Sequence, residues 1–373
     1  MSLPDFYQAD LDRLSTAGRR RALRPAGGID FSSNDYLGLA NSEALRNVAR
    51  DAIERGVSPG SGGSRLLRGN SHEHEALESE AASFFGAESA LFIGSGFAAN
   101  SLLLATLPQS DDVIFFDELI HASTHEGMRL SRAPGAAFSH NDANAAANAI
   151  LAWRKQGGRG TPWIALESLY SMDGDIAPLS DFTALAEREG AMLLIDEAHA
   201  VGVFGPQGRG LAADFQGRTD TIVLATCGKA LGCEGALILA PETIRDFLIN
   251  RGRSLIFSTA PSPLIAAIVR ASLELTAAAD DRRERLRHSI ATTQLMLEAC
   301  GLPYSGSQIQ PIIIGEDART IGIAEELQKR GFDVRGIRPP TVPKSTSRLR
   351  VSITLNADHT AIATLGDALR ELL

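Results

Sequence analysis

Short apolar runs alternate with segments of helical periodicity through the middle of the chain. This alternation predicts a mostly parallel β-sheet with helices on both of its faces. The alanine-rich segment 143–152 predicts one of those helices. The apolar runs that predict strands are Ala90–Ile93, Val113–Phe116, Trp163–Glu167, Met192–Ile195, Thr221–Ala225 and Ala236–Leu239.

The pattern differs on either side of this central region, so we expect three parts. Residues 1–50 form an N-terminal segment that is basic at Arg19–Arg21. Residues 51–245 are expected to form a large α/β domain, and residues 246–373 a smaller C-terminal α+β domain. The last part shows helical patterns at 265–298 and 321–330 and strand patterns at 310–314, 333–334 and 348–354.

Composition narrows the class of protein. The chain has 373 residues, of which 44% are hydrophobic and 22% charged, as is usual for a globular enzyme. A net charge of −9 gives no general attraction to nucleic acid or to an anionic membrane, so neither is an expected partner. The three cysteines are too scattered for a disulfide framework, and no apolar signal segment or 18-residue apolar run occurs. We therefore expect a cytoplasmic protein.

An acid, a histidine and a lysine follow two of the expected strands. Asp196 and His199 come at the end of one apolar run, and Lys229 comes after the next. The carboxyl ends of parallel strands lie at one edge of a sheet, where ligands bind. These side chains together suit pyridoxal phosphate (PLP): the lysine attaches the cofactor, the aspartate keeps the pyridine nitrogen protonated, and the histidine contacts the ring. Taken singly, Asp196 could form a buried ion pair and Lys229 could be a solvated surface residue.

Two glycine-rich segments could bind phosphate. Residues 91–100 show a strand, a glycine turn and a helix start, so the first free N–H groups of the helix could hold the PLP phosphate. A plain glycine turn is the alternative. Gly60–Ser64 follows no convincing strand and lacks the Gly-Lys-Ser/Thr ending of a nucleotide-binding loop. It is expected to be a flexible segment near the active site, or only a linker.

The sequence argues against two other interpretations, a helicase and a metal site. Asp196–His199 spells the acidic box of a helicase class, but that class needs a phosphate-binding loop that is absent here. His72 and His74 are two residues apart, so on a helix they would point to different faces. Cys227 and Cys233 have no further cysteine or histidine at metal-binding spacing. We expect no metal site.

The chain resembles the α-oxoamine synthases, which are PLP enzymes of the aminotransferase-like fold (fold type I), over nearly its whole length. The similar segments are 31–38, 60–65, 171–175, 196–210 and 257–259. Within the family, the Arg-Pro-Pro of residues 338–340 with Arg348–Arg350 is most similar to members that make 8-amino-7-oxononanoate for biotin synthesis. A family member that takes glycine or serine with another acyl-CoA is the main alternative. A non-enzymatic protein of the same fold is a more distant one.

The resemblance implies a role for each site residue. Lys229 would hold PLP and then act as the base on the amino acid's α-carbon, which requires a lowered lysine pKa. Asp196 would pair with the ring nitrogen. His121 would stack on the ring, and His199 would hydrogen-bond its oxygen. The other expected cofactor contacts are Gly96, Phe97, Ser171, Thr226 and, from the other subunit, Thr259. The expected substrate contacts are Arg19, Asn34, His74, Arg338 and Arg350.

Several of these roles have simple alternatives. Arg350 is expected to bind the amino acid carboxylate in a two-pronged pair. Arg19 is expected near the far carboxylate of the acyl chain, or else at a solvated basic helix end. The weaker candidates could be ordinary capping or core polar groups. The segment from Arg24 to Ile29 is shorter than in relatives, which could shift the acyl entrance, and Cys227 and Cys233 are expected only to pack.

The reaction implied by the resemblance is a decarboxylating condensation. L-Alanine and a pimeloyl thioester give the amino ketone, CO2 and a free thiol. The resemblance also implies a homodimer with active sites shared between subunits. The sequence leaves open whether the acyl donor is a CoA or a carrier-protein thioester, and how strictly chain length is selected.

Overall fold

The computed structural model describes residues 5–23 and 25–373, so Arg24 lies outside the described residues. The chain divides into two packed units. The large unit consists of Asn34–Ser171 and Asp175–Glu284. The small unit consists of the described residues before Asn34, of Met172–Gly174 and of Arg285–Leu373.

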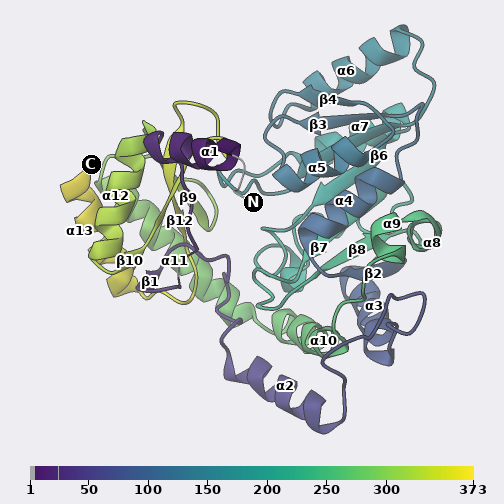
Figure 1. Cartoon of the computed structure of the whole chain (residues 1–373), viewed down its shortest axis with the longest axis horizontal. Coiled ribbons are helices and arrows are strands. Elements are labelled where there is room, and N and C mark those ends of the chain that lie inside the picture. The colour runs from purple at the N-terminus through teal and green to yellow at the C-terminus, as the bar shows by residue number, and fades with distance from the viewer. Residues whose placement is uncertain (1–4, 24) are drawn as a thin grey trace. The chain divides into compact units, whose positions relative to one another are not determined.

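The large unit is built around a seven-stranded sheet in the order β2-β8-β7-β6-β5-β3-β4 (Figure 1). The run from β7 to β4 is parallel, and β8 is antiparallel to both β7 and β2. The strands are β2 (Ser89–Ile93), β3 (Val113–Asp117), β4 (Gly135–Phe138), β5 (Pro162–Glu167), β6 (Met192–Asp196), β7 (Thr221–Thr226) and β8 (Ala236–Ala240). The prediction of a mostly parallel sheet is confirmed, although β4 was not predicted.

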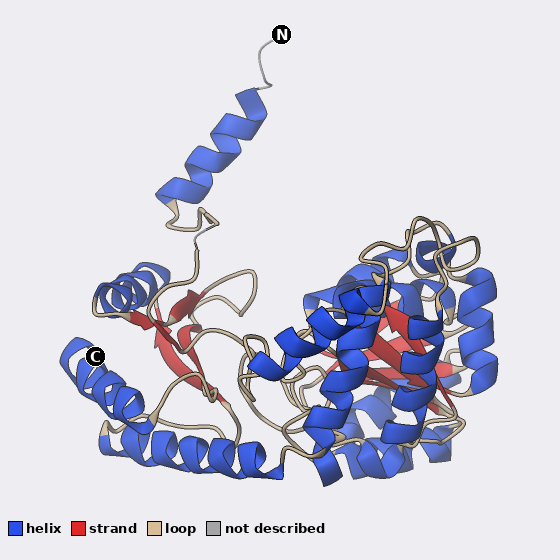
Figure 2. Ribbon diagram, turned by 90° about the horizontal axis from the view of Figure 1, so that it is seen from below, coloured by secondary structure: helices blue, strands red, loops and turns tan. Residues whose placement is uncertain are grey.

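Helices lie on both faces of this sheet (Figure 2). The helices of the large unit are α2 (Glu43–Glu54), which packs against α10, α3 (His72–Phe85), α4 (Gly96–Thr106), α5 (Ala122–Leu130), α6 (Ala143–Lys155), α7 (Leu179–Glu189), α8 (Glu242–Arg251), α9 (Arg253–Ile256) and α10 (Pro263–Ala277). The predicted alanine-rich helix is α6. Two short 3-10 turns, Pro206–Gly208 and Ala213–Phe215, follow β6.

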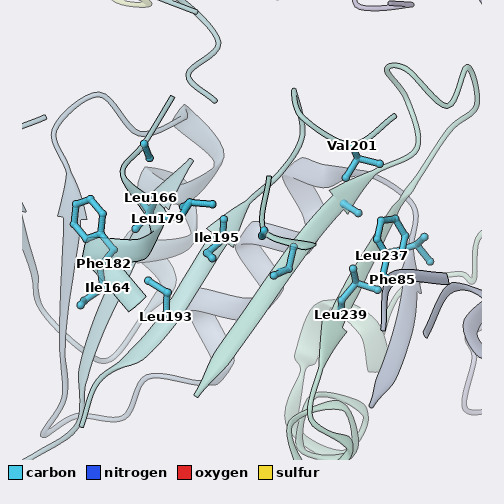
Figure 3. Packing of buried hydrophobic residues seen from close by; sticks show 14 of the residues in the cluster. Phe85, Ile164, Leu166, Leu179, Phe182, Leu193, Ile195, Val201, Leu237 and Leu239 are labelled. Carbon is cyan, nitrogen blue, oxygen red and sulfur yellow. The ribbon is translucent and has the colours of Figure 1, made fainter. Parts of the chain in front are cut away.

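Successive residues of the central strands enter two different hydrophobic clusters. Leu193 and Ile195 pack in one cluster, part of which is drawn in Figure 3, and Leu194 packs in the other. This alternation follows from the two-residue period of a strand. Each fully buried leucine or isoleucine stabilises the fold by about 1.5–3 kcal/mol. The strands that end in these polar residues are therefore held in place by a well-packed hydrophobic core.

The small unit has an α+β architecture, as predicted. Its three-stranded antiparallel sheet has the order β11-β12-β9, and β1 pairs with β10 in parallel. Its strands are β1 (Ile29–Asp30), β9 (Ile309–Gly315), β10 (Phe332–Asp333), β11 (Arg335–Ile337) and β12 (Ser347–Ser352). Its helices are α1 (Asp5–Thr16), α12 (Asp317–Lys329) and α13 (His359–Leu372), and it includes most of α11 (Asp280–Ala299).

The helical pattern of residues 265–298 corresponds to two helices rather than one. Helix α10 ends at Ala277, and α11 begins at Asp280. The Arg283 guanidinium donates hydrogen bonds to the carbonyl oxygens of Thr276 (2.6 Å) and Ala277 (3.3 Å). These are carbonyls of the last turn of α10, which have no partner within that helix. The arginine therefore stabilises the helix end.

The division into units differs from the expected boundaries at residues 50 and 246. Helix α10 packs against α2 and α3, and α8 and α9 pack against α4, so all three belong to the large unit. The chain joins the large unit from Asn34 onward, where Arg282 donates a 2.7 Å hydrogen bond to the carbonyl oxygen of Leu37. Within the described part of the chain, every helix is too short or too polar to cross a bilayer.

Candidate active site

A cavity of about 320 Å³ lies at the carboxyl edge of the large unit's sheet. The ends of β5, β6 and β7 contribute Glu167, Asp196 and Thr226 to its lining. The segments that follow β6 and β7 contribute His199 and Lys229. The acid, the histidine and the lysine that follow the strands in the sequence are therefore brought together in one cavity.

Asp196 ends β6 with only 6% of its surface exposed. One carboxylate oxygen accepts a hydrogen bond from the Asn100 side-chain amide at 2.8 Å, and the other accepts one from the Ala198 backbone N–H at 3.0 Å. Both donors are neutral. A buried carboxylate is best stabilised by a cation, so the space beside Asp196 suits a ligand with a protonated ring nitrogen.

Lys229 begins a chain of hydrogen bonds. Its Nζ lies 2.7 Å from His199 Nε2, and His199 Nδ1 lies 2.6 Å from the Tyr36 hydroxyl. The Tyr36 hydroxyl donates to Asn34 Oδ1 at 3.1 Å. These contacts are mutually consistent if His199 is neutral and protonated at Nδ1. Asn34 therefore fixes the orientation of Tyr36, and its predicted contact with substrate stays a prediction.

His121 precedes α5, and its ring also lines the cavity. Its Nδ1 accepts a hydrogen bond from the Ser123 backbone N–H at 3.2 Å and lies 2.8 Å from the Ser123 hydroxyl, to which the Asn100 amide donates. Burial lowers the pKa of His121, and the nearby Asp196 carboxylate offsets only part of this effect. A neutral imidazole can lie against an aromatic ring without adding a positive charge.

The glycine turn before α4 forms one end of the cavity. The Ser95 hydroxyl caps the helix by accepting from the Ala98 N–H at 3.1 Å. A Cβ at Gly96 would lie 2.7 Å from Thr226 Cγ2, so only glycine permits this approach to β7. The backbone N–H groups of Gly96 and Phe97 belong to the first turn of α4, where anions bind. With Asp196 and Lys229 in the same cavity, these residues fit a phosphate-bearing cofactor such as PLP.

Sequence reasoning missed Glu167, Asn100 and Tyr36. Glu167 is 2% exposed and ends β5 just as Asp196 ends β6. Burial raises the pKa of Glu167 well above its usual value, and the charge of Asp196 raises it further. A polar residue at the end of an apolar run was the available signal for Glu167, since the same signal identified Asp196. Ser171 follows β5, and its contact with PLP stays a prediction.

The segment after α9 carries Thr259 and contacts the glycine-rich loop 60–64. The Ser61 hydroxyl donates to the Ala260 carbonyl at 2.8 Å, and the Ala260 N–H donates to the Gly63 carbonyl at 2.9 Å. Thr259 lines a second cavity, of about 190 Å³, together with Gly94 and Ser95. The glycine-rich segment is thus a loop tied to the Thr259 segment.

His74 is completely buried on α3, whereas His72 is exposed, so the two point to different faces as predicted. The Nδ1 atom of His74 accepts from the Ser71 N–H at 3.2 Å, and its Nε2 lies 2.9 Å from the Pro261 carbonyl oxygen. Burial lowers the pKa of His74. The structure therefore gives this histidine a packing role, and a substrate contact stays a prediction.

Three predicted substrate residues belong to the small unit. Arg350, on β12, is buried and donates a 2.7 Å hydrogen bond to the Ser352 hydroxyl. Arg19 forms a 2.7 Å ion pair with Asp317 and lines a cavity of about 620 Å³ with other basic side chains. Burial, followed by the charge of Arg21, lowers the pKa of Arg338. The roles of these arginines toward substrate stay predictions.

Comparisons with known proteins place these features in context. The family described as aminotransferase class I and II matches residues 26–365. An 8-amino-7-oxononanoate synthase from Chromobacterium violaceum is 42% identical over 343 residues, which cover 91% of this chain and 88% of that protein. One from Geobacter sulfurreducens is 39% identical over 385 residues, covering 97% of each.

Solved structures give the same architecture. A serine palmitoyltransferase from S. paucimobilis, with a bound PLP-myriocin aldimine, has a TM-score of 0.89 and 25% identity, covering 99% of this chain and 96% of that one. An 8-amino-7-oxononanoate synthase from Francisella tularensis has a TM-score of 0.77 and 28% identity, covering 92% and 97%.

Proposed function

The chain belongs to the aminotransferase class I and II family, and from this premise we propose that it is a PLP-dependent acyltransferase that makes 8-amino-7-oxononanoate in biotin biosynthesis. It joins the α-carbon of L-alanine to the carbonyl carbon of a pimeloyl thioester. The alanine carboxylate leaves as CO2, and the thiol is released. The observation that carries this proposal is the near full-length similarity, at about 40% identity, to several proteins named for that product.

The cavity residues account for how PLP would be held. Lys229 would attach it, Asp196 would face its ring nitrogen, and the first turn of α4 with Thr226 would receive its phosphate. Bound PLP supplies an electron sink that stabilises negative charge at the amino acid's α-carbon. The buried position of Asp196 supports this assignment, because a fixed carboxylate keeps a ring nitrogen protonated.

The protein's own side chains would then remove and return the protons of the reaction. Lys229 Nζ removes the α-proton of alanine and later returns a proton to the product. His199 Nε2, 2.7 Å away, receives a hydrogen bond from the amine and fixes its direction. Tyr36 and Asn34 hold His199 in the required tautomer. His121, kept neutral by burial, would lie against the ring.

The solved serine palmitoyltransferases favour a second candidate, in which serine and a longer acyl thioester are the substrates. Their backbones superpose on this chain with TM-scores up to 0.89, but only 25–27% of residues are identical. Backbone similarity is shared by enzymes of one fold with different substrates. Sequence identity of 39–42% bears more directly on the side chains that select a substrate, so we favour alanine and the pimeloyl group.

A direct assay tests the proposal. Purified protein with PLP is incubated with L-alanine, glycine or L-serine and with pimeloyl, palmitoyl or acetyl thioesters, and CO2 and the amino ketone are measured. Only the pair of alanine and pimeloyl should give rapid turnover. Lys229→Ala should abolish turnover while circular dichroism still reports a folded protein. Preferred turnover with serine and palmitoyl would overturn the proposal in favour of the second candidate.

We also propose that the enzyme acts in the cytoplasm as a homodimer in which Thr259 of one subunit serves the other subunit's phosphate site. Within one chain, Thr259 lines a cavity that shares Gly94 and Ser95 with the main cavity, and the assignment of Thr259 to the other subunit's site rests on the resemblance of residues 257–259 to the α-oxoamine synthases. Mixing Lys229→Ala chains with Thr259→Ala chains tests the sharing. If sites are shared, the mixed dimer has one intact site, and activity returns. No return of activity, with mixed dimers demonstrated by mass spectrometry, would refute the sharing.

A further inference from the structure

Two buried carboxyl groups lie side by side at the floor of the active-site cavity. Glu167 and Asp196 are register partners on the parallel strands β5 and β6, and both line the cavity. Adjacent strands are about 4.8 Å apart. Two negative charges at this spacing in a buried site repel each other strongly, so one of the two groups keeps its proton.

The hydrogen-bond partners identify which group that is. Asp196 receives a bond from Asn100 and another from Ala198, one at each carboxylate oxygen. The backbone N–H groups of His121 and Ser171 face the Glu167 carboxyl and favour its ionised form, but less than burial and Asp196 oppose it. The Oε1 atom of Glu167 has no hydrogen-bond partner within the described part of the chain. Asp196 is therefore the better stabilised anion, and Glu167 is the neutral acid.

The charged groups around Glu167 support the same assignment. Burial raises the pKa of the Glu167 carboxyl, and Asp196 on β6 raises it further. Lys229, which follows β7, acts in the opposite direction but less strongly. His121, which precedes α5, has a lowered pKa and adds no positive charge at neutral pH.

The two N–H donors belong to turns that carry cofactor-site residues. His121 lies between β3 and α5, and Ser171 lies after β5. The backbone between the strands and these residues is irregular and is held by bridge and turn hydrogen bonds, such as those from the Tyr170 N–H to the Asp175 carbonyl and from the Ile120 N–H to the Asp117 carbonyl, both 3.0 Å. A single acceptor group that binds both N–H groups ties these turns to each other at the cavity floor.

We propose that Glu167 is a positioning residue of the cofactor site. Its neutral carboxyl group holds the turns of His121 and Ser171 in place and leaves Asp196 as the ionised carboxyl of the pair. The inference deepens the proposed PLP-dependent function, because those two turns are the ones expected to contact the cofactor. Glu167 acts through the residues of these turns and does not itself react.

The protein without cofactor provides the first test. A carboxyl group that is protonated in the folded state but ionised in the unfolded state, whose pKa is about 4.3, lowers stability progressively as pH rises above that value. Glu167→Gln keeps the acceptor and removes the ionisation. The Tm of Glu167→Gln minus that of the wild type should therefore increase between pH 5 and pH 8. A difference that stays constant between pH 5 and pH 8, as for a glutamate that is ionised in both the folded and the unfolded state, would overturn the proposal.

Two further variants support this test, one as a control and one as a substitute for Glu167→Gln. Glu197→Gln is the matched control, since Glu197 is equally buried and follows Asp196 in sequence but does not line the cavity. Burial raises the pKa of Glu197 to about 7, so the Tm gain of Glu197→Gln should level off near neutral pH and shows the gain that a buried glutamate outside the cavity gives over the same pH range. If Glu167→Gln does not fold, Glu167→Met, which is uncharged and similar in size, takes its place in the same comparison.

The second test uses PLP and its absorption band. Glu167→Gln should bind PLP within about two-fold of the wild type, and the pH midpoint of the band should not move, because no charge is removed. Asp196→Asn should shift that midpoint. Glu167→Ala, which frees both turns, should weaken PLP binding about ten-fold or more. A midpoint shift in Glu167→Gln, or unchanged PLP affinity in Glu167→Ala, would overturn the positioning role. Failure of the wild type to bind PLP would instead refute the proposed function and leave the pH-dependent Tm result standing.

Discussion

Replacing Tyr36 with phenylalanine removes one oxygen atom from the hydrogen-bond chain that begins at Lys229. The side chain is fully buried, and its hydroxyl contacts His199 Nδ1 at 2.6 Å and Asn34 Oδ1 at 3.1 Å. Removing one partner from a buried hydrogen bond costs about 1–3 kcal/mol. The His199 Nδ1–H would lose this acceptor, and the tautomer that presents Nε2 to Lys229 would no longer be favoured.

If that cost falls on the transition state, kcat/KM for alanine should decrease about 5- to 150-fold, since 1.36 kcal/mol corresponds to a factor of ten. Steady-state assays with alanine and the pimeloyl thioester across a pH series measure it, and the pH optimum should also move because the proton on His199 is held less firmly. Tyr170→Phe is the control, because Tyr170 is also buried but takes no part in the hydrogen-bond chain from Lys229 to Asn34. A Tyr36→Phe enzyme with kcat/KM within two-fold of the wild type and an unchanged pH profile would show that the chain does not orient the lysine.

Three further changes have definite expected results. Arg350→Ala should weaken alanine binding by roughly 2–5 kcal/mol with little effect on the thioester, because one member of a desolvated charge pair is lost; unchanged alanine binding in a spectral titration would make Arg350 structural. Arg19→Ala should erode the preference for pimeloyl over an uncharged acyl chain of similar length, as measured by the ratio of kcat/KM values; equal losses with both donors would indicate general attraction of CoA phosphates. Although burial lowers the pKa of His140, hydrogen bonds to Asp117 and Asp175 raise it to about 10. The stabilisation of the folded protein by protonated His140 is therefore complete below pH 6.5 and is lost as the pH rises through about 10. His140→Gln should therefore lower the Tm at pH 7 and flatten the decline of Tm between pH 7 and pH 10, and an unchanged decline would contradict this sign.

The parts of the fold that followed from the sequence were those with a long, regular pattern. The strands β5, β6 and β7 are continuous apolar runs, because strands buried on both faces need apolar residues at every position. Strand β4, Gly135–Phe138, contains two alanines and a glycine, and it lies at the edge of the sheet. Its weak apolar signal is a consequence of its edge position, so no local pattern could distinguish it from a loop.

The break between α10 and α11 shows another limit of local patterns. Helical periodicity continues across Ala278 and Ala279, both of which are good helix formers. The end of α10 is stabilised by Arg283, which binds its last carbonyls, and this is an interaction of the folded chain and not a property of the two alanines. Helix ends made by a side chain from the next helix leave no distinctive residue at the break itself.

The residues of the candidate site also divide into those that a local sequence pattern reveals and those that depend on contacts in the folded chain. Asp196 and Lys229 were found because each follows an apolar run, and parallel strands bring such ends together. Tyr36 and Asn100 could not be found in this way, since their hydrogen bonds to His199 and Asp196 join residues 163 and 96 positions apart in sequence. Glu167 stands between these cases. Its position at the end of β5 was visible, but only the register that sets it opposite Asp196 shows that a second negative charge adds to the effect of burial on its pKa. Reading strand ends in pairs, once strand order is known, would have identified Glu167 as part of the site.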